Sequence, residues 1–174
     1  MANWQEVSPD VWYGTRPLAQ VSAADLQWLQ DRARISPRGR ARLCAHPQPE
    51  AALHEMLICL ARTSYVRPHR HRKPESAHII RGACDLVFFD EQGGVKHMLA
   101  LSELARGNPF FVRIEEPLYH TYLLKTDFLL FHETTLGPLE RRLTEFAPWA
   151  PEEGELAPEF LEHLRARIER HRRC

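Results

Sequence analysis

Residues 65–82 read YVRPHRHRKPESAHIIRG, and this stretch decides the fold. It contains the spacing His69-x-His71-x3-Glu75-x6-Gly82. Side chains two apart on a β-strand point to the same face, so His69 and His71 project together. Glu75 can return from the next strand, and Gly82 suits the turn that follows. Imidazole and carboxylate suit a borderline divalent metal, so the spacing predicts one Fe, Mn, Ni, Co or Zn ion.

The same alternation places Tyr65, Arg67, His69 and His71 on one face of the predicted strand. This polar row could face solvent, as is common in antiparallel sheets. It could also face a barrel interior, where it is costly unless it binds something. Roughly 0.003 chance matches to the motif are expected at this length and composition. The spacing therefore favours the interior.

Length and composition bound the class of protein. A chain of 174 residues suits one domain with extensions. Basic and acidic residues balance at 23 each, which argues against nucleic acid as a partner. No apolar run approaches the ~20 residues of a membrane span, and a signal-peptide pattern is missing at the start. Four cysteines without a C-x-x-C pair predict reduced thiols, a buried Cys59 and Cys84, and a cytoplasmic location.

Residues 1–40 are predicted to form an N-terminal helical extension. Ser22 suits the N-cap of a helix, and Asp25 suits the third helical position of a capping box. The helix should continue to about Arg34 with an apolar stripe formed by Leu26, Leu29 and Ala33.

Residues 41–136 are predicted to form a β-barrel. Short runs rich in Ile, Val, Leu and Phe alternate with turn signals, and one hairpin should close at Gly93-Gly94. The clearest runs are 56–60, 77–80, 85–89 and 128–131. Many short strands at regular spacing favour a β-sandwich or barrel.

Residues 137–174 are predicted to form a proline-rich segment followed by a C-terminal helix. Pro158 suits the first turn of that helix. Its apolar positions should be Phe160, Leu161, Leu164 and Ile168. Its basic end suits the helix dipole and a solvated face, and comprises Arg165, Arg167, Arg170, Arg172 and Arg173.

Further candidate site residues lie outside the first motif. His120 follows a proline turn and begins a strand-like run, so it is the best candidate for a fourth ligand. Tyr122 lies two residues later, on the same face. Of His132 and Glu133 one should point inward, and we favour Glu133 as a group beside the ligands or the substrate. Arg67 could pair with a carboxylate or phosphate, and Tyr65 and Tyr122 could donate hydrogen bonds. Packing or solvent contact is the alternative role for Arg67 and both tyrosines.

These residues resemble a known family. The spacing from His69 to Gly82 resembles the first cupin motif, and Pro117-x2-His120 resembles the core of the second. The flanking Ser36-Pro37-Arg38 and the segment 146–152 are similar to WbuC-type cupin-fold metalloproteins, a resemblance that covers roughly residues 36–153. The chain departs from the usual motifs at Thr63, where a glycine is typical, and in 115–119, which lacks a P-x-G turn.

The resemblance implies a mainly β fold, a double-stranded β-helix (the cupin or jelly-roll barrel). It also implies one divalent metal, bound by His69, His71, Glu75 and His120. It suggests a metal-dependent enzyme acting on a small polar metabolite such as a sugar or sugar derivative, linked to bacterial surface-polysaccharide metabolism.

Several alternatives stay open on the sequence. The reaction could be an isomerisation or epimerisation, or that of a non-haem iron dioxygenase, and no catalytic residue is assigned. The chain could also be a binding or sensing module without turnover. An open polar pocket would favour an enzyme, and a pocket plugged by side chains a sensor. Pairing through sheet edges predicts a homodimer.

Overall fold

The computed structural model describes residues 3–138 and 144–171. Its helices are α1 (Ala23–Ile35), α2 (Ala157–His171) and a short 3-10 helix η1 (Leu104–Arg106). Its strands are β1 (Trp4–Ser8), β2 (Val11–Gly14), β3 (Arg40–Cys44), β4 (Leu53–Ala61), β5 (His69–His71), β6 (Glu75–Arg81), β7 (Ala83–Phe89), β8 (Val95–Ser102), β9 (Phe111–Ile114), β10 (Tyr119–Leu124), β11 (Phe128–Leu136) and β12 (Thr144–Phe146). The runs predicted as strands at 56–60, 77–80, 85–89 and 128–131 all lie in strands.

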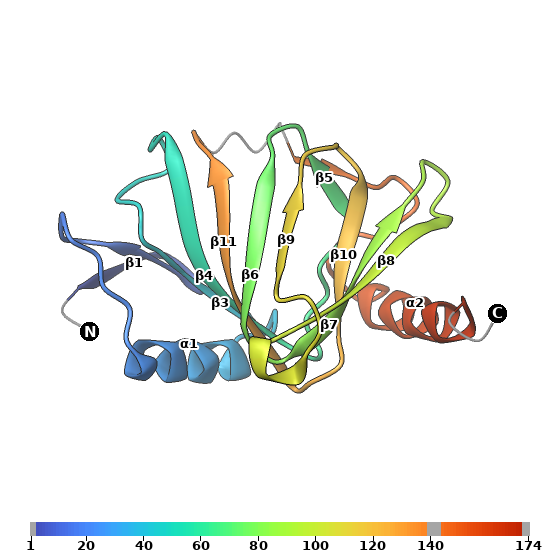
Figure 1. Ribbon diagram of the computed structural model, residues 1–174, viewed down its shortest axis with the longest axis horizontal. Coiled ribbons are helices and arrows are strands. Elements are labelled where there is room, and N and C mark those ends of the chain that lie inside the picture. Colours follow the sequence, from blue (N-terminus) through green and yellow to red (C-terminus); the bar gives the residue numbers. More distant parts are fainter. Residues whose placement is uncertain (1–2, 139–143, 172–174) are drawn as a thin grey trace.

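The strands form two sheets that face each other. The larger sheet has the order β1-β2-β3-β4-β11-β6-β9, and the smaller has the order β12-β5-β10-β7-β8. From β4 to β11 the chain passes repeatedly between them, so that β4-β11-β6-β9 face β5-β10-β7-β8 (Figure 1). This is the strand order of a jelly roll, two Greek keys wound together. The predicted double-stranded β-helix is confirmed.

The barrel is apolar at one end and polar at the other. Leu86 of β7 and Leu129 of β11 are fully buried between the sheets. On β11 the inward side chains change along the strand from Leu129 and Phe131 to Glu133 and Thr135. The apolar end is therefore a packed core, and the polar end is the mouth of the barrel, lined by polar side chains.

Helix α1 covers the outer face of the larger sheet. The predicted capping box is confirmed, because Ser22 accepts from the backbone of Asp25 and the Asp25 side chain accepts from the backbone of Ser22. Leu29 and Ala33 are fully buried and pack in one cluster with Leu43 of β3. The helix thus stabilises β3 and β4 from outside.

Strands β1 and β2 were not predicted from the sequence. They form an antiparallel pair, and β2 then pairs in parallel with β3. The N-terminal region therefore adds two strands to the larger sheet as well as the predicted helix. This widens the sheet beyond the barrel and brings Tyr13 of β2 to the cavity described below.

Helix α2 covers the outer face of the smaller sheet, as Figure 1 shows. Pro158 lies in its first turn, and the buried side chains are Ala157, Leu161, Leu164 and Ile168. Phe160 is partly buried against the same cluster, so the predicted apolar face is confirmed. Arg172 and Arg173 of the predicted basic end, and Cys174, lie outside the described residues.

Local predictions at the turns and cysteines are also confirmed. Gly82 has a φ of +95°, and a Cβ there would collide with the carbonyl oxygen of Phe128. Strands β7 and β8 form the predicted hairpin. Cys59 and Cys84 are fully buried, and burial raises the pKa of each thiol to about 12.

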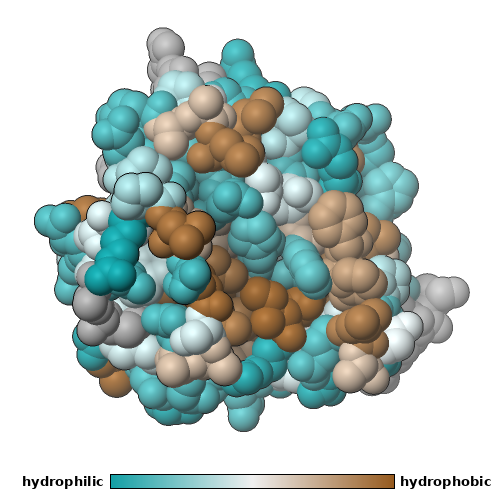
Figure 2. Space-filling view, turned by 60° about the vertical axis from the view of Figure 1, so that its left-hand side comes forward, coloured by the Kyte–Doolittle hydropathy of each residue, from teal (hydrophilic) through white to brown (hydrophobic). Residues whose placement is uncertain are grey.

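The outer edges of the larger sheet are β1 and β9. Each carries an exposed apolar residue, Val7 and Phe111 respectively. The face in Figure 2 shows hydrophobic patches set among hydrophilic side chains. The homodimer stays a prediction. Within the described part of the chain, no helix is long and apolar enough to cross a membrane.

The capping box gives a first prediction. Ser22→Ala should lower the free energy of unfolding by about 1 kcal/mol, because the backbone N–H of Asp25 loses its acceptor. Chemical denaturation measures the change. Ser22→Thr keeps a hydroxyl acceptor and should lose less. Equal losses for both variants would contradict a role of the cap in holding α1.

Candidate metal centre

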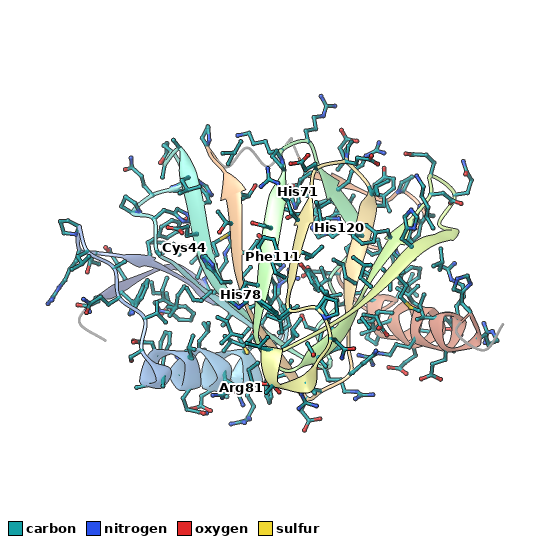
Figure 3. All side chains as sticks on the ribbon, in the orientation of Figure 1. Cys44, His71, His78, Arg81, Phe111 and His120 are labelled. Carbon is teal, nitrogen blue, oxygen red and sulfur yellow. The ribbon has the colours of Figure 1, made fainter. Side chains whose placement is uncertain are left out.

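Four ionisable side chains meet at the mouth of the barrel. Their residues are His69 and His71 of β5, Glu75 of β6 and His120 of β10. In the pairing of β10 with β5, His120 lies directly opposite His69. His69 and His71 share a face because they are two apart, and both line the cavity inside the barrel. The ring centroid of His69 lies 4.8 Å from the ring centroid of His71 and 4.8 Å from that of His120. Figure 3 shows His71 and His120 at the same end of the barrel.

The carboxylate of Glu75 lies between two of the imidazoles. Its Oε1 is 3.1 Å from Nε2 of His120, and its Oε2 is 3.8 Å from Nε2 of His71. Glu75 is 7% exposed and His120 is 2% exposed. These two residues are thus removed from water, and in such a buried position an unpaired charge would be strongly destabilising.

Each of the three histidines is held in place through its Nδ1 atom. Nδ1 of His69 lies 2.8 Å from the carbonyl of Arg67, and Nδ1 of His120 lies 3.0 Å from the carbonyl of Leu118. Nδ1 of His71 lies 3.2 Å from the hydroxyl of Thr144. A carbonyl only accepts, so Nδ1 of His69 and His120 must donate. This leaves Nε2 of His69 with a free lone pair, whereas Nε2 of His120 donates to the carboxylate of Glu75. Metal-binding histidines in proteins are oriented in this way.

The electrostatics keep the centre close to charge balance. Burial, with the nearby imidazoles, lowers the pKa of His69 to about 3, and burial also lowers the pKa of His71. Burial alone would lower the pKa of His120, but its hydrogen bond to Glu75 outweighs this and raises it. Burial alone would raise the pKa of Glu75, but the same hydrogen bond and the three imidazoles lower it. His69 and His71 are therefore neutral, the form that binds metals.

The donor set fits a divalent ion in its chemistry. Two ligand atoms at about 2.1 Å from one ion and at right angles lie about 3 Å apart, close to the 3.1 Å between Glu75 and His120. Within residues 3–138 and 144–171, no three His, Cys, Asp or Glu side chains are placed so that they could hold a metal ion. The four residues therefore match a metal centre in donor type, while in this structure Glu75 is paired to His120.

A cavity of about 400 Å³ opens from this centre. Of the other predicted site residues, Arg67, Tyr122 and Glu133 line it. The ring of Tyr122 is tilted by 30° against the ring of Phe131, with the ring centroids 5.1 Å apart. Arg67 lies over the ring of Phe146 and is 3.5 Å from the exposed carboxylate of Glu152.

Glu133 is an unusual carboxyl group. Burial, together with the negative charge of Glu75, raises its pKa to about 8, although Arg42 and His120 act in the opposite direction. Burial, together with the negative charges of Glu133 and Glu75, raises the pKa of Tyr122 well above its ordinary value. Both groups can therefore carry a proton near neutral pH inside the cavity.

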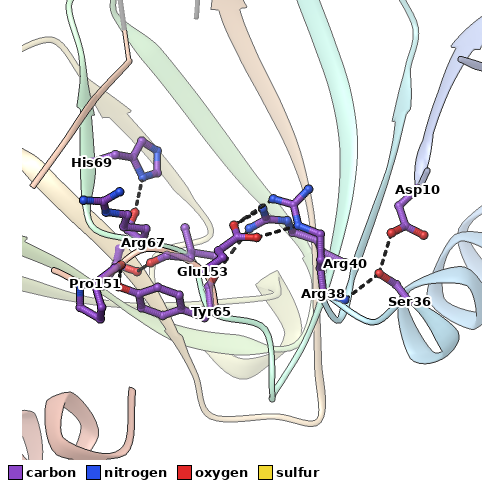
Figure 4. Close-up of polar contacts among 11 residues, drawn as sticks. Asp10, Ser36, Arg38, Arg40, Tyr65, Arg67, His69, Pro151 and Glu153 are labelled. Carbon is purple, nitrogen blue, oxygen red and sulfur yellow. Dashed lines mark hydrogen bonds and ion pairs between the residues drawn. The ribbon is translucent and has the colours of Figure 1, made fainter. Parts of the chain in front are cut away.

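The prediction that Tyr65 shares a face with His69 and His71 is wrong. Tyr65 packs on the outer side of the smaller sheet against Phe160 of α2, and its hydroxyl donates to the carbonyl of Pro151 at 2.9 Å (Figure 4). Only His69–His71 pairs as a strand. Pro68 lacks an N–H and interrupts the pairing, so the two-residue alternation does not extend back to Tyr65.

Other cavity residues were not predicted as site residues. Arg42 of β3 lies opposite Ile58 of β4, and both side chains face the cavity. Arg38 and Arg40 also line it and pair with Glu153, as Figure 4 shows. Arg40 and Arg42 lie in β3 and Arg38 lies just before it, and no spacing rule connects them to the histidine motif.

Comparison with known proteins gave limited similarity. A family model described as a domain of unknown function (DUF6016) matches residues 21–101, less than half of the chain. That match includes His69, His71 and Glu75 but not His120. The search of curated proteins found no match.

Several solved structures are similar at low identity. A structural-genomics protein from Shewanella oneidensis has a TM-score of 0.48 and 13% identity, covering 59% of this chain and 66% of its own. Bacillus subtilis oxalate decarboxylase at pH 4.6 has a TM-score of 0.48 and 17% identity, covering 62% of this chain and 27% of that one. A mutant of the same enzyme has a TM-score of 0.44 and 19% identity, covering 55% and 24%. The chain thus spans about a quarter of the length of the decarboxylase.

The new position of Tyr65 gives a second prediction. Tyr65→Phe should lower the free energy of unfolding by about 1 kcal/mol, because the half-buried carbonyl of Pro151 loses its hydrogen bond. Bound metal, measured by elemental analysis, should not change. A Tyr65→Phe variant with normal stability and a reduced metal content would instead indicate that Tyr65 belongs to the metal centre.

Proposed function

We propose that this chain binds one divalent metal ion through His69, His71, Glu75 and His120. The observation that carries the proposal is that all three imidazoles are held at Nδ1 and gather around one buried carboxylate. Purely structural histidines have no need of a common orientation. The metal identity stays open among Fe, Mn, Ni, Co and Zn, since each accepts these ligands.

We also propose that the metal serves an enzyme acting on a small polar metabolite. A plugged barrel would have favoured a sensing module, whereas the cavity of about 400 Å³ supports a bound small molecule. A bound divalent ion would supply a Lewis acid that polarises a carbonyl or hydroxyl oxygen.

The chain's own side chains suit an isomerisation or epimerisation. Glu133 can hold a proton at its carboxyl and release it to a substrate in the cavity, and Tyr122 can donate from its phenol. Arg67 can orient an oxygen-rich group at the mouth. Two proton carriers beside one cavity favour proton transfer over a dioxygenase reaction, which does not require them.

The sequence resemblance to WbuC-type cupins adds a proposed setting, the metabolism of a sugar or sugar derivative for the bacterial surface. This part of the proposal rests on sequence motifs alone.

The proposed metal centre gives a third prediction. Purified protein should contain close to one divalent ion per chain by plasma mass spectrometry. His69→Ala and His71→Ala should each lower that content by more than about tenfold, because each removes a ligand.

His78→Ala is the matched control. His78 lies on β6 but is exposed on the outer face, so its loss should leave the metal content unchanged. Full metal retention in the His69 and His71 variants would sink the assignment of these ligands.

A further inference from the structure

The wall of the cavity away from the histidines is formed by strands that do not belong to the jelly roll itself. Arg42 of β3 and Tyr13 of β2 both line the cavity. In the register of the larger sheet, Arg42 lies opposite Ile58, and Ile58 lies opposite Phe131. Residues directly opposite in neighbouring strands point to the same face, so the guanidinium of Arg42 is directed into the cavity with Ile58 and Phe131.

The arginines around the cavity differ in how they are neutralised. Glu153 pairs with both Arg38 and Arg40, and Glu145 pairs with Arg72. Arg42 and Arg67 are different. Among the described residues the Nε of each is buried and has no hydrogen-bond partner, but Arg67 also lies 3.5 Å from Glu152 and donates to the carbonyl of Ala147. A buried donor of this kind is expensive unless a ligand completes it.

Arg42 is also close enough to Glu133 to influence it electrostatically. The negative charge of Glu75, in the proposed metal centre, in turn raises the pKa of Glu133. The cavity therefore runs from the histidines past Glu133 to Arg42. Three interstrand steps separate β6 from β3 in the sheet order, about 14 Å along the curved sheet.

We propose that Arg42 is an anion-binding residue that recognises a carboxylate or phosphate group of the ligand. Its planar fork of donors suits both anions. Resting on the proposed function, this inference makes the substrate acidic, a sugar acid or a sugar phosphate, with its reacting oxygens at the histidine end and its anion at Arg42. Strand β3, which joins the N-terminal extension to the barrel, would then determine substrate specificity.

The test uses inorganic phosphate and malonate as probes on the full chain, with thermal shift and calorimetry as readouts. At matched ionic strength, which removes general screening effects, one or both anions should raise the melting temperature of the native protein, and glucose should not. Arg42→Gln should weaken binding of the active anion by about tenfold or more. A response to phosphate alone indicates a phosphorylated ligand, and a response to malonate alone indicates a carboxylate.

Arg16→Gln is the matched control, because Arg16 is exposed and lies outside the cavity lining. It should bind the anions as the native protein does. If Arg42→Gln fails to fold, Arg42→Lys keeps the charge without the fork and should still weaken binding. Anion binding that is equal in the native, Arg42 and Arg16 proteins, or absent from the native protein, would overturn the proposal.

The metal content of the same samples separates this proposal from the previous one. Arg42→Gln should keep its metal while losing the anion. The His71→Ala protein should lose its metal while still binding the anion at Arg42. Loss of anion binding in His71→Ala, with normal binding in Arg42→Gln, would show that the anion binds at the histidines instead, and would overturn the role of Arg42.

Discussion

The burial of the Glu75 carboxylate is the constraint on which the mouth of this barrel depends. A carboxylate at 7% exposure would be strongly destabilising by itself, because its charge has left water. His120 pairs with this carboxylate, with its Nε2 3.1 Å from Oε1 of Glu75, and His69 and His71 complete the polar surroundings. These imidazoles can do so only because β5 and β10 pair with His69 opposite His120. The strand register of the jelly roll therefore determines which side chains surround the buried carboxylate of Glu75.

The rest of the architecture supports this arrangement from both sides. Helix α1 packs on the larger sheet, which carries Glu75 and Glu133, and α2 packs on the smaller sheet, which carries the histidines. The apolar end of the barrel supplies the packed core, so the polar end can keep an open cavity. Strands β1 and β2 then extend the larger sheet beyond β3, and β3 with the residues just before it brings arginines to the far wall. A common fold thus acquires a distinct cavity from a short extension.

Sequence reasoning succeeded where a local rule was decisive. The capping box at Ser22, the hairpin at Gly93-Gly94, the turn at Gly82 and the apolar face of α2 all follow from patterns within a few residues. Tyr65 was placed wrongly because Pro68 interrupts the alternation that the prediction extended across it. The strands β1, β2 and β12 were missed because they are short and gain their stability from pairing with distant strands. Arg42 was missed for the same reason, since only the register of β3 with β4 shows which way it points.

The central claim is that the buried quartet is a metal centre rather than a hydrogen-bonded cluster. The most direct measurement is anomalous X-ray diffraction from crystals of the purified protein, recorded at the absorption edge of the metal found by elemental analysis. The account predicts one strong peak within about 2.0–2.3 Å of Nε2 of His69, His71 and His120 and of a carboxylate oxygen of Glu75. Density with no anomalous peak there, and with Glu75 still hydrogen-bonded to His120, would contradict it.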